Sequence, residues 1–155
     1  SNLEFLKFPD NRLDSVCRLE LIQAIEQKIN SYTPECIYVH HVGDVNIDHR
    51  RLHEAVVTAC RPTPPNPVTQ LFSFEVASST EWQPPGSGSP FTPNWFIDIS
   101  SQLDRKCSAL EVYSSEMRDW PHPRSIESIR HLASWRGSQI GICAAEAFYV
   151  LRSCR

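Results

Sequence analysis

Side chains that bind metals or transfer protons are concentrated between positions 40 and 50, where the sequence is HHVGDVNIDHR. Imidazole and carboxylate groups are the ligands that suit zinc and similar divalent metals. Histidines, aspartates and an asparagine in one short segment therefore suggest a metal-dependent site.

The neighbouring elements would place this segment at an edge of a sheet. The apolar residues 36–39 predict a buried strand, and residues 51–57 predict a helix. In open α/β sheets, ligands bind in the crevice beyond the carboxyl ends of the strands. We therefore expect the segment after Val39 to lie at the carboxyl edge of the sheet.

The rest of the chain alternates between strand and helix patterns. Strands are predicted over 3–8, 70–76 and 95–99, and residues 83–93 predict a long loop. Helices are predicted after a cap at Asp14 or Ser15, from about position 103, and after a cap at Ser125. This succession predicts a single α/β domain over residues 1–155 with a mostly parallel sheet.

Composition narrows the possible partners. The net charge of −3 argues against a nucleic-acid-binding surface, and the sequence has no apolar run of membrane-spanning length. Six scattered cysteines without a C-x-x-C pair favour core thiols in a reducing compartment. With no leader pattern at the first residues, we expect a cytoplasmic protein without nucleic-acid or membrane partners.

Four spaced segments resemble one known family. They are residues 44–50, 74–82, 121–125 and 136–148, and they occur in the family's order along nearly the whole chain. The family is that of the LmbE-like, or PIG-L, deacetylases. The resemblance implies a Rossmann-like three-layer sandwich and a zinc-dependent hydrolase. It also implies a substrate that is an N-acetylglucosamine-type sugar or a related amide, from whose nitrogen the acetyl group is removed.

The resemblance also implies site residues. His49 stands where the family carries its later zinc ligand, and Asp48 precedes it as a catalytic residue that orients neighbouring groups. His122 lies in a loop that approaches the sugar in relatives and is the second predicted catalytic residue. The predicted substrate-binding residues are Asp44, Asn46 and Arg50, and Asn46 replaces a histidine found in many members.

One family motif does not occur in this sequence. No His-Pro-Asp-Asp segment is present, and in the family this segment supplies the general base and two of the three metal ligands. We therefore expect an incomplete domain that lacks the first strands: a fragment, a truncated product, or a chain completed by another polypeptide. Such a chain would be inactive alone and would form homo-oligomers; the alternative is a non-catalytic relative that associates with itself or a partner.

Several of these residues also have a purely structural interpretation. Asp44 and Asp48 are carboxylates near a helix start, where the helix dipole favours them. His53 follows His49 by one helical turn, but without a third partner the pair is more simply incidental. Trp82, like other tryptophans here, fits either a packing anchor or a surface on which a sugar stacks.

Overall fold

Four strands form one sheet in the order β1-β2-β4-β3 in the computed structural model, which describes residues 2–154. The strands are β1 (Cys36–His40), β2 (Gln70–Phe74), β3 (Trp95–Asp98) and β4 (Ala145–Ser153). The helices are η1 (Leu13–Ser15, a 3-10 helix), α1 (Arg18–Tyr32), α2 (Ile47–Ala59), α3 (Leu103–Glu111) and α4 (Ile126–Ser138). The predicted α/β class is confirmed.

The prediction of a mostly parallel sheet is wrong for these four strands. Only β1 and β2 pair in parallel, whereas β4 is antiparallel to both β2 and β3. A single helix, α2, connects β1 to β2, and a one-helix crossover returns the chain in the same direction. Two helices, α3 and α4, connect β3 to β4. These two helices return the chain to the same end of the sheet at which β3 finishes, so β4 starts there and runs antiparallel to β3. The last residue of β3, Asp98, therefore pairs with the first residue of β4, Ala145.

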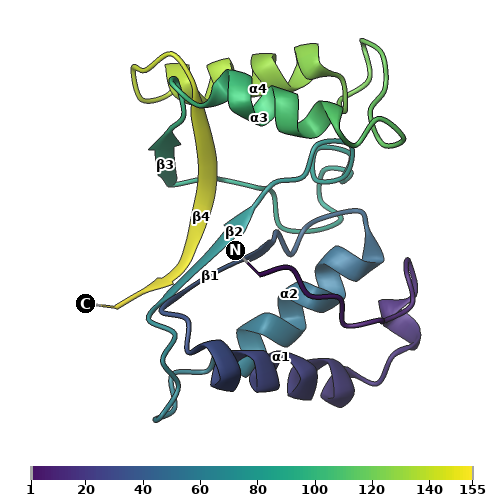
Figure 1. Cartoon of the computed structure of the whole chain (residues 1–155), viewed down its shortest axis with the longest axis vertical. Helices are drawn as coiled ribbons and strands as arrows, with labels where there is room; N and C mark the ends of the chain where they lie inside the picture. The colour runs from purple at the N-terminus through teal and green to yellow at the C-terminus, as the bar shows by residue number, and fades with distance from the viewer. Residues whose placement is uncertain (1, 155) are drawn as a thin grey trace.

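Helices α1 and α2 lie at one end of the molecule, and α3 and α4 lie at the other, with the sheet between them (Figure 1). The larger core joins α1, α2, β1 and β2. It is built from buried aliphatic side chains, including Leu21, Ile25, Val39, Val56 and Leu71. A smaller cluster of Ile99, Ala133 and Ala144 lies under α3 and α4. The carboxyl edge of β1 and β2 therefore lies between two separately packed pairs of helices.

The start of the chain differs from prediction. Residues 3–8 form no strand, and Leu3 and Phe5 are exposed, because this segment pairs with no strand of the sheet. Asp14 and Ser15 belong to η1 and cap nothing; α1 begins only at Arg18. None of the helices in residues 2–154 has both the length and the apolar character needed to cross a membrane.

Candidate functional site

The segment after β1 lies where the sequence predicts it, at the carboxyl edge of the sheet. Because β1 and β2 are parallel, the segments that follow them emerge at the same edge. Asn46 caps α2, and its side-chain oxygen accepts a hydrogen bond from the backbone N–H of Asp48 at 2.8 Å. The cap turns the chain sharply, so that the loop residue Asp44 and the first-turn residue His49 come together.

Asp44 is the most completely buried charged residue of the site. Its Oδ1 accepts hydrogen bonds from the backbone N–H of Asn46 at 2.8 Å and from the Ser79 hydroxyl, and its Oδ2 accepts one from Thr80 at 2.8 Å. Its Oδ2 also lies 3.1 Å from Nδ1 of His49. Burial alone would raise the pKa of Asp44, but these contacts outweigh it and lower that pKa to about 2. Asp44 is therefore an ionised carboxylate inside the protein.

This burial changes the role that Asp44 can have. The sequence predicts a substrate-binding residue, yet the side chain is fully buried and its oxygens are occupied by protein groups. An ionised carboxylate can only accept hydrogen bonds. Oδ2 of Asp44 can therefore only accept from His49, whose Nδ1 lies 3.1 Å away, and a proton on Nδ1 would leave Nε2 as the unprotonated nitrogen of a neutral ring.

His40 packs directly on His49. The two rings are stacked, with centroids 3.9 Å apart and planes 13° from parallel. Burial, followed by the neighbouring His49, lowers the pKa of His40 to about 4. His40 is thus neutral at pH 7, and it supports the His49 ring without adding a positive charge.

His41 in the segment and His53 on α2 are held by carbonyl groups. Nδ1 of His53 donates to the carbonyl of His40 at 2.7 Å, and Nε2 of His41 donates to the carbonyl of Ser89 at 2.9 Å. His53 is buried and serves as a link between α2 and β1. These bonds support the structural interpretation of the His49 and His53 spacing.

Asp48 is occupied by main-chain donors. Its two oxygens accept hydrogen bonds from the backbone N–H groups of Asn11 at 2.7 Å and Leu13 at 2.9 Å. Asp48 thereby ties the N-terminal segment to the first turn of α2, as a structural carboxylate near a helix start would. The side chain of Asn46 donates to Asn11 at 3.4 Å on the same side.

The remaining predicted residues lie apart from this cluster. Arg50 follows His49 on α2, but it does not line the large cavity described below; its Nε is buried and, among the described residues, has no partner. Nδ1 of His122 accepts the backbone N–H of Arg124 at 3.0 Å, so the neutral ring carries its proton on Nε2. The His122 ring meets the edge of Trp82 at 5.8 Å between centroids.

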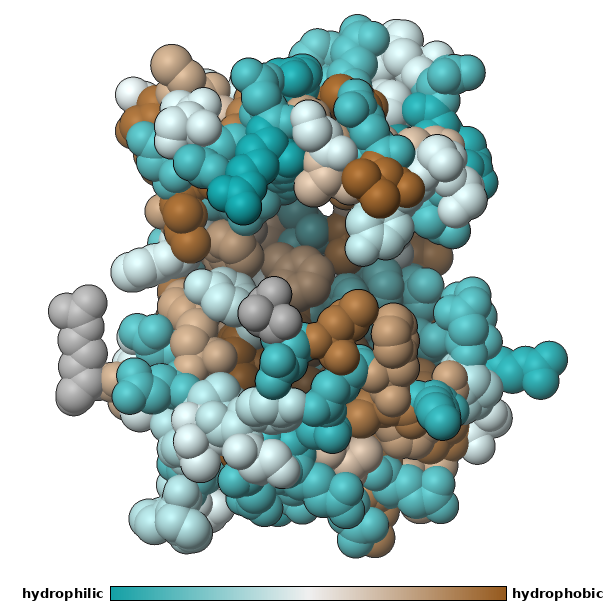
Figure 2. Space-filling view, in the orientation of Figure 1, coloured by the Kyte–Doolittle hydropathy of each residue, from teal (hydrophilic) through white to brown (hydrophobic). Residues whose placement is uncertain are grey.

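A cavity of about 960 Å³ opens beside His49. Its walls come from the start of α2, from the segment after β2, and from α3 and α4; they include Asn46, His49, Trp82, Tyr113 and Leu132. Figure 2 shows that the surface is hollowed between the part with α1 and α2 and the part with α3 and α4. This volume is within the usual range for small-molecule sites.

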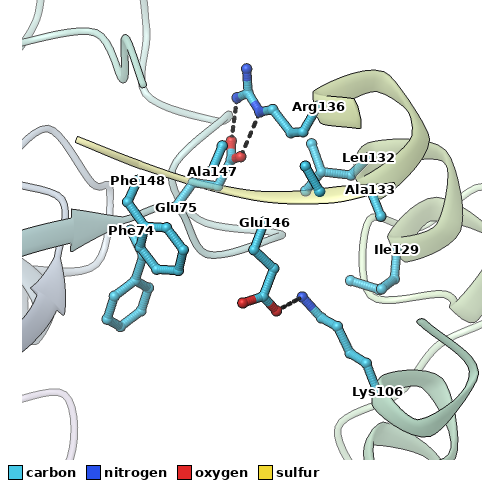
Figure 3. Close-up of a pocket in the computed structure, with 11 residues that line it drawn as sticks. Phe74, Glu75, Lys106, Ile129, Leu132, Ala133, Arg136, Glu146, Ala147 and Phe148 are labelled. Carbon is cyan, nitrogen blue, oxygen red and sulfur yellow. Dashed lines mark hydrogen bonds and ion pairs between the residues drawn. The ribbon is translucent and has the colours of Figure 1, made fainter. Parts of the chain in front are cut away.

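A smaller cavity of about 170 Å³ adjoins it under α4 (Figure 3). Its charged side chains are paired with one another: Arg136 with Glu75, and Lys106 with Glu146. Phe74 and Phe148 add an apolar wall. With both cations neutralised, this smaller cavity is not an anion site.

The donors in this cluster fit only part of a zinc site. His49 fits one ligand position, because a buried carboxylate holds Nδ1, as is typical of histidines that bind a metal through the other nitrogen. A catalytic zinc site needs three protein ligands. Within residues 2–154, no three His, Cys, Asp or Glu side chains gather closely enough to hold a metal. The described residues thus fit one ligand position and not a complete zinc site.

Sequence reasoning missed Ser79, Thr80 and Asn11 as parts of this arrangement. Ser79 and Thr80 belong to the segment 74–82, but nothing in their spacing identifies Asp44 as their partner. The only local signal is a run of hydroxyl residues before Glu81, which is typical of side chains that bind a turn.

Comparisons with known proteins agree with the predicted resemblance. The family model PIG-L, described as GlcNAc-PI de-N-acetylase, matches residues 1–60, which include the segment from His40 to Arg50. No curated protein is significantly similar in sequence.

Two solved structures share the fold. One is the conserved protein TT1542 from Thermus thermophilus, with 23% identity and a TM-score of 0.75 over 99% of this chain and 68% of that one. The other is the N,N'-diacetylchitobiose deacetylase from Pyrococcus horikoshii, with 16% identity and a TM-score of 0.74 over 98% of this chain and 58% of that one. This chain therefore spans only part of the length of either protein. The family model matches residues 1–60, and the fold is shared with both structures along nearly the whole chain, in agreement with the resemblance to the PIG-L, or LmbE-like, deacetylases.

Proposed function

We propose that this chain contributes to a deacetylase-like hydrolase of N-acetylated sugars or related amides, with His49 as one zinc ligand. The observation that carries the proposal is the contact between buried Asp44 and His49 beside a cavity of about 960 Å³. The PIG-L match and the fold shared with a chitobiose deacetylase support the same reaction class.

The chain's own groups have distinct parts in this proposal. Oδ2 of Asp44 lies 3.1 Å from Nδ1 of His49, and a proton on Nδ1 would leave Nε2 available. Trp82 is 52% exposed at the cavity wall and offers an indole surface to a sugar ring. His122 contacts the edge of Trp82 from outside the cavity wall and carries the proton of its neutral ring on Nε2. His49 would hold one coordination position of a zinc ion, and the chemistry that such an ion would supply is polarisation of the amide carbonyl and activation of water.

We further propose that the 155-residue chain alone binds zinc weakly and releases little acetate. One histidine does not satisfy the three-ligand requirement, and a missing member of a catalytic unit typically costs several orders of magnitude in rate. Supplying the His-Pro-Asp-Asp segment, from a longer reading frame or from a relative, should then produce activity.

Zinc-dependent acetate release from N-acetylglucosamine derivatives tests both proposals. The chain as it stands, the restored chain, and the restored chain with His49→Ala are compared, and the last should lose zinc and activity. Asn46→Ala should cost less. His131→Ala is a matched control, because His131 lies on α4 against Trp120 and outside the cavity wall. Full activity after His49→Ala would refute the zinc-ligand role, and robust activity of the chain as it stands would refute the inactivity.

A further inference from the structure

The turn after β2 surrounds the carboxylate of Asp44. Ser79 and Thr80 are both buried and donate their hydroxyl protons to opposite oxygens of Asp44. Glu81 stabilises the turn itself. Its carboxylate accepts hydrogen bonds from the backbone N–H groups of Ser78 at 2.6 Å and Ser79 at 3.2 Å. The Thr80 hydroxyl also accepts the backbone N–H of Val76 at 2.8 Å, so its proton is directed toward Asp44.

This arrangement leaves one accepting position of Asp44 for His49. A carboxylate has about four lone-pair positions. Three of them accept the backbone N–H of Asn46 and the hydroxyls of Ser79 and Thr80. These three donors from the protein hold the carboxylate in place, and its Oδ2 lies 3.1 Å from Nδ1 of His49.

We propose that Ser79 and Thr80 are positioning residues: through Asp44 they fix the ring orientation and the tautomer of His49, with Nδ1 protonated and Nε2 free. Ser79 and Thr80 would thus support His49 indirectly, through Asp44. Their importance for catalysis rests on the proposed function, whereas their effect on the His49 ring does not. In a merely structural role, the two hydroxyls would hold the loop closed without selecting a tautomer of His49.

The test measures the tautomer directly, in the absence of substrate and metal. The ¹⁵N shifts of the His49 ring are recorded at a pH where the ring is neutral, in the native chain, Thr80→Val and Thr80→Ser. Thr80→Val keeps the shape and removes the donor. Losing one hydrogen bond of ordinary strength should lower the ratio of the Nδ1–H to the Nε2–H form about five-fold. Thr80→Ser restores the hydroxyl and should restore the native shifts.

A matched control is available on the adjoining helix. The hydroxyl of Thr58 donates to the carbonyl of Glu54 at 2.7 Å and does not contact Asp44, so Thr58→Val should leave the His49 shifts unchanged. If Thr80→Val fails to fold, Ser79→Ala removes a hydroxyl from the other oxygen and should also shift the ratio.

Native His49 shifts in folded Thr80→Val or Ser79→Ala would overturn the positioning role. This result is distinct from failure of the proposed function. Should the shifts change as expected while acetate release by the restored chain survives His49→Ala, the positioning role stands and the zinc-ligand role falls.

Discussion

Arg136 on α4 makes two hydrogen bonds to the carboxylate of Glu75, the residue that directly follows β2. The atom pairs are Nε–Oε1 at 2.7 Å and Nη2–Oε2 at 2.6 Å (Figure 3). The side chains of Arg136 and Glu75 are only 13% and 19% exposed. This pair fixes α4 against the end of β2, and it thereby sets the position of one cavity wall relative to the segment that holds Asp44.

Arg136→Gln should lower the free energy of unfolding by about 2 kcal/mol, because it leaves a largely buried carboxylate without its charged partner. Arg136→Lys should lower it by less, since the charge remains but the two-bond geometry is lost. Urea denaturation measures both. Arg51→Gln is the control: it breaks the exposed pair with Glu54 and should cost less than about 1 kcal/mol. Equal losses in the two glutamine variants would contradict the prediction.

Asp44 should make stability sensitive to acid. Its pKa is about 2 in the folded chain, below its ordinary value of 3.8, so the unfolded chain binds more protons between these values. The ionised Asp44 carboxylate contributes about 2 kcal/mol to the free energy of unfolding. This contribution is complete above pH 4 and is lost as the pH falls toward 2.

Urea unfolding between pH 6 and pH 2 measures this effect as the difference between the native chain and Asp44→Asn. The difference should shrink in acid. Asp104→Asn, at a side chain that is 89% exposed, should show no such change. Parallel acid curves for the native chain and Asp44→Asn would show that Asp44 is not responsible.

Gly43 should be essential for docking of the loop over residues 83–93. A Cβ at this position would lie 1.9 Å from the carbonyl oxygen of Ser89, which also accepts the His41 hydrogen bond. Gly43→Ala should therefore displace the loop and cost about 1–3 kcal/mol. Proteolysis within the loop should become faster. Gly88→Ala is the control, because a Cβ there comes closest to the flexible end of Gln83, at 3.0 Å, and lies at an ordinary contact distance of 3.6 Å from the Cα of Gly43. Equal proteolysis in both variants would argue against a docked loop.

Trp82 should contribute to sugar affinity if the proposed substrate class is right. Trp82→Ala should weaken binding of N-acetylglucosamine oligosaccharides about five-fold, whereas Trp82→Phe should retain most of it. Calorimetry or ligand-observed NMR measures the affinities. Trp120 is equally exposed, at 53% against 52%, but it does not line the cavity. Trp120→Ala should leave the affinity unchanged, and matching losses in the two alanine variants would remove Trp82 from the sugar site.

We expect the chain to self-associate at micromolar concentration. β1 lies at the edge of the sheet, and Tyr38 on it is 48% exposed beside the ring of Phe72. Unpaired strand edges and exposed apolar side chains favour association. Sedimentation should show oligomers that Tyr38→Lys weakens and that Trp135→Lys on α4 does not. A monomer at all concentrations would refute the prediction.

The sequence by itself determined most of the local elements after position 17 and the place of the site. Helix and strand patterns depend on neighbouring residues, so the strand before His40, the cap at Ser125 and the loop over 83–93 are found as predicted. The sequence also placed the segment from His40 to Arg50 at the carboxyl edge of the sheet, because that rule needs only the order of elements.

Only the tertiary structure decided the direction of the strands and the hydrogen-bond partners of each polar side chain. Residues 3–8 have a weak strand pattern but find no partner in the sheet, and β4 returns antiparallel after a two-helix connection. Asp44 and Asp48 are both acidic residues near one helix start. One is buried under hydroxyls that lie 35 and 36 positions away in sequence, and the other is occupied by main-chain donors near position 12. Burial and hydrogen-bond partners come from the packing of distant segments, so residue type and spacing cannot reveal them.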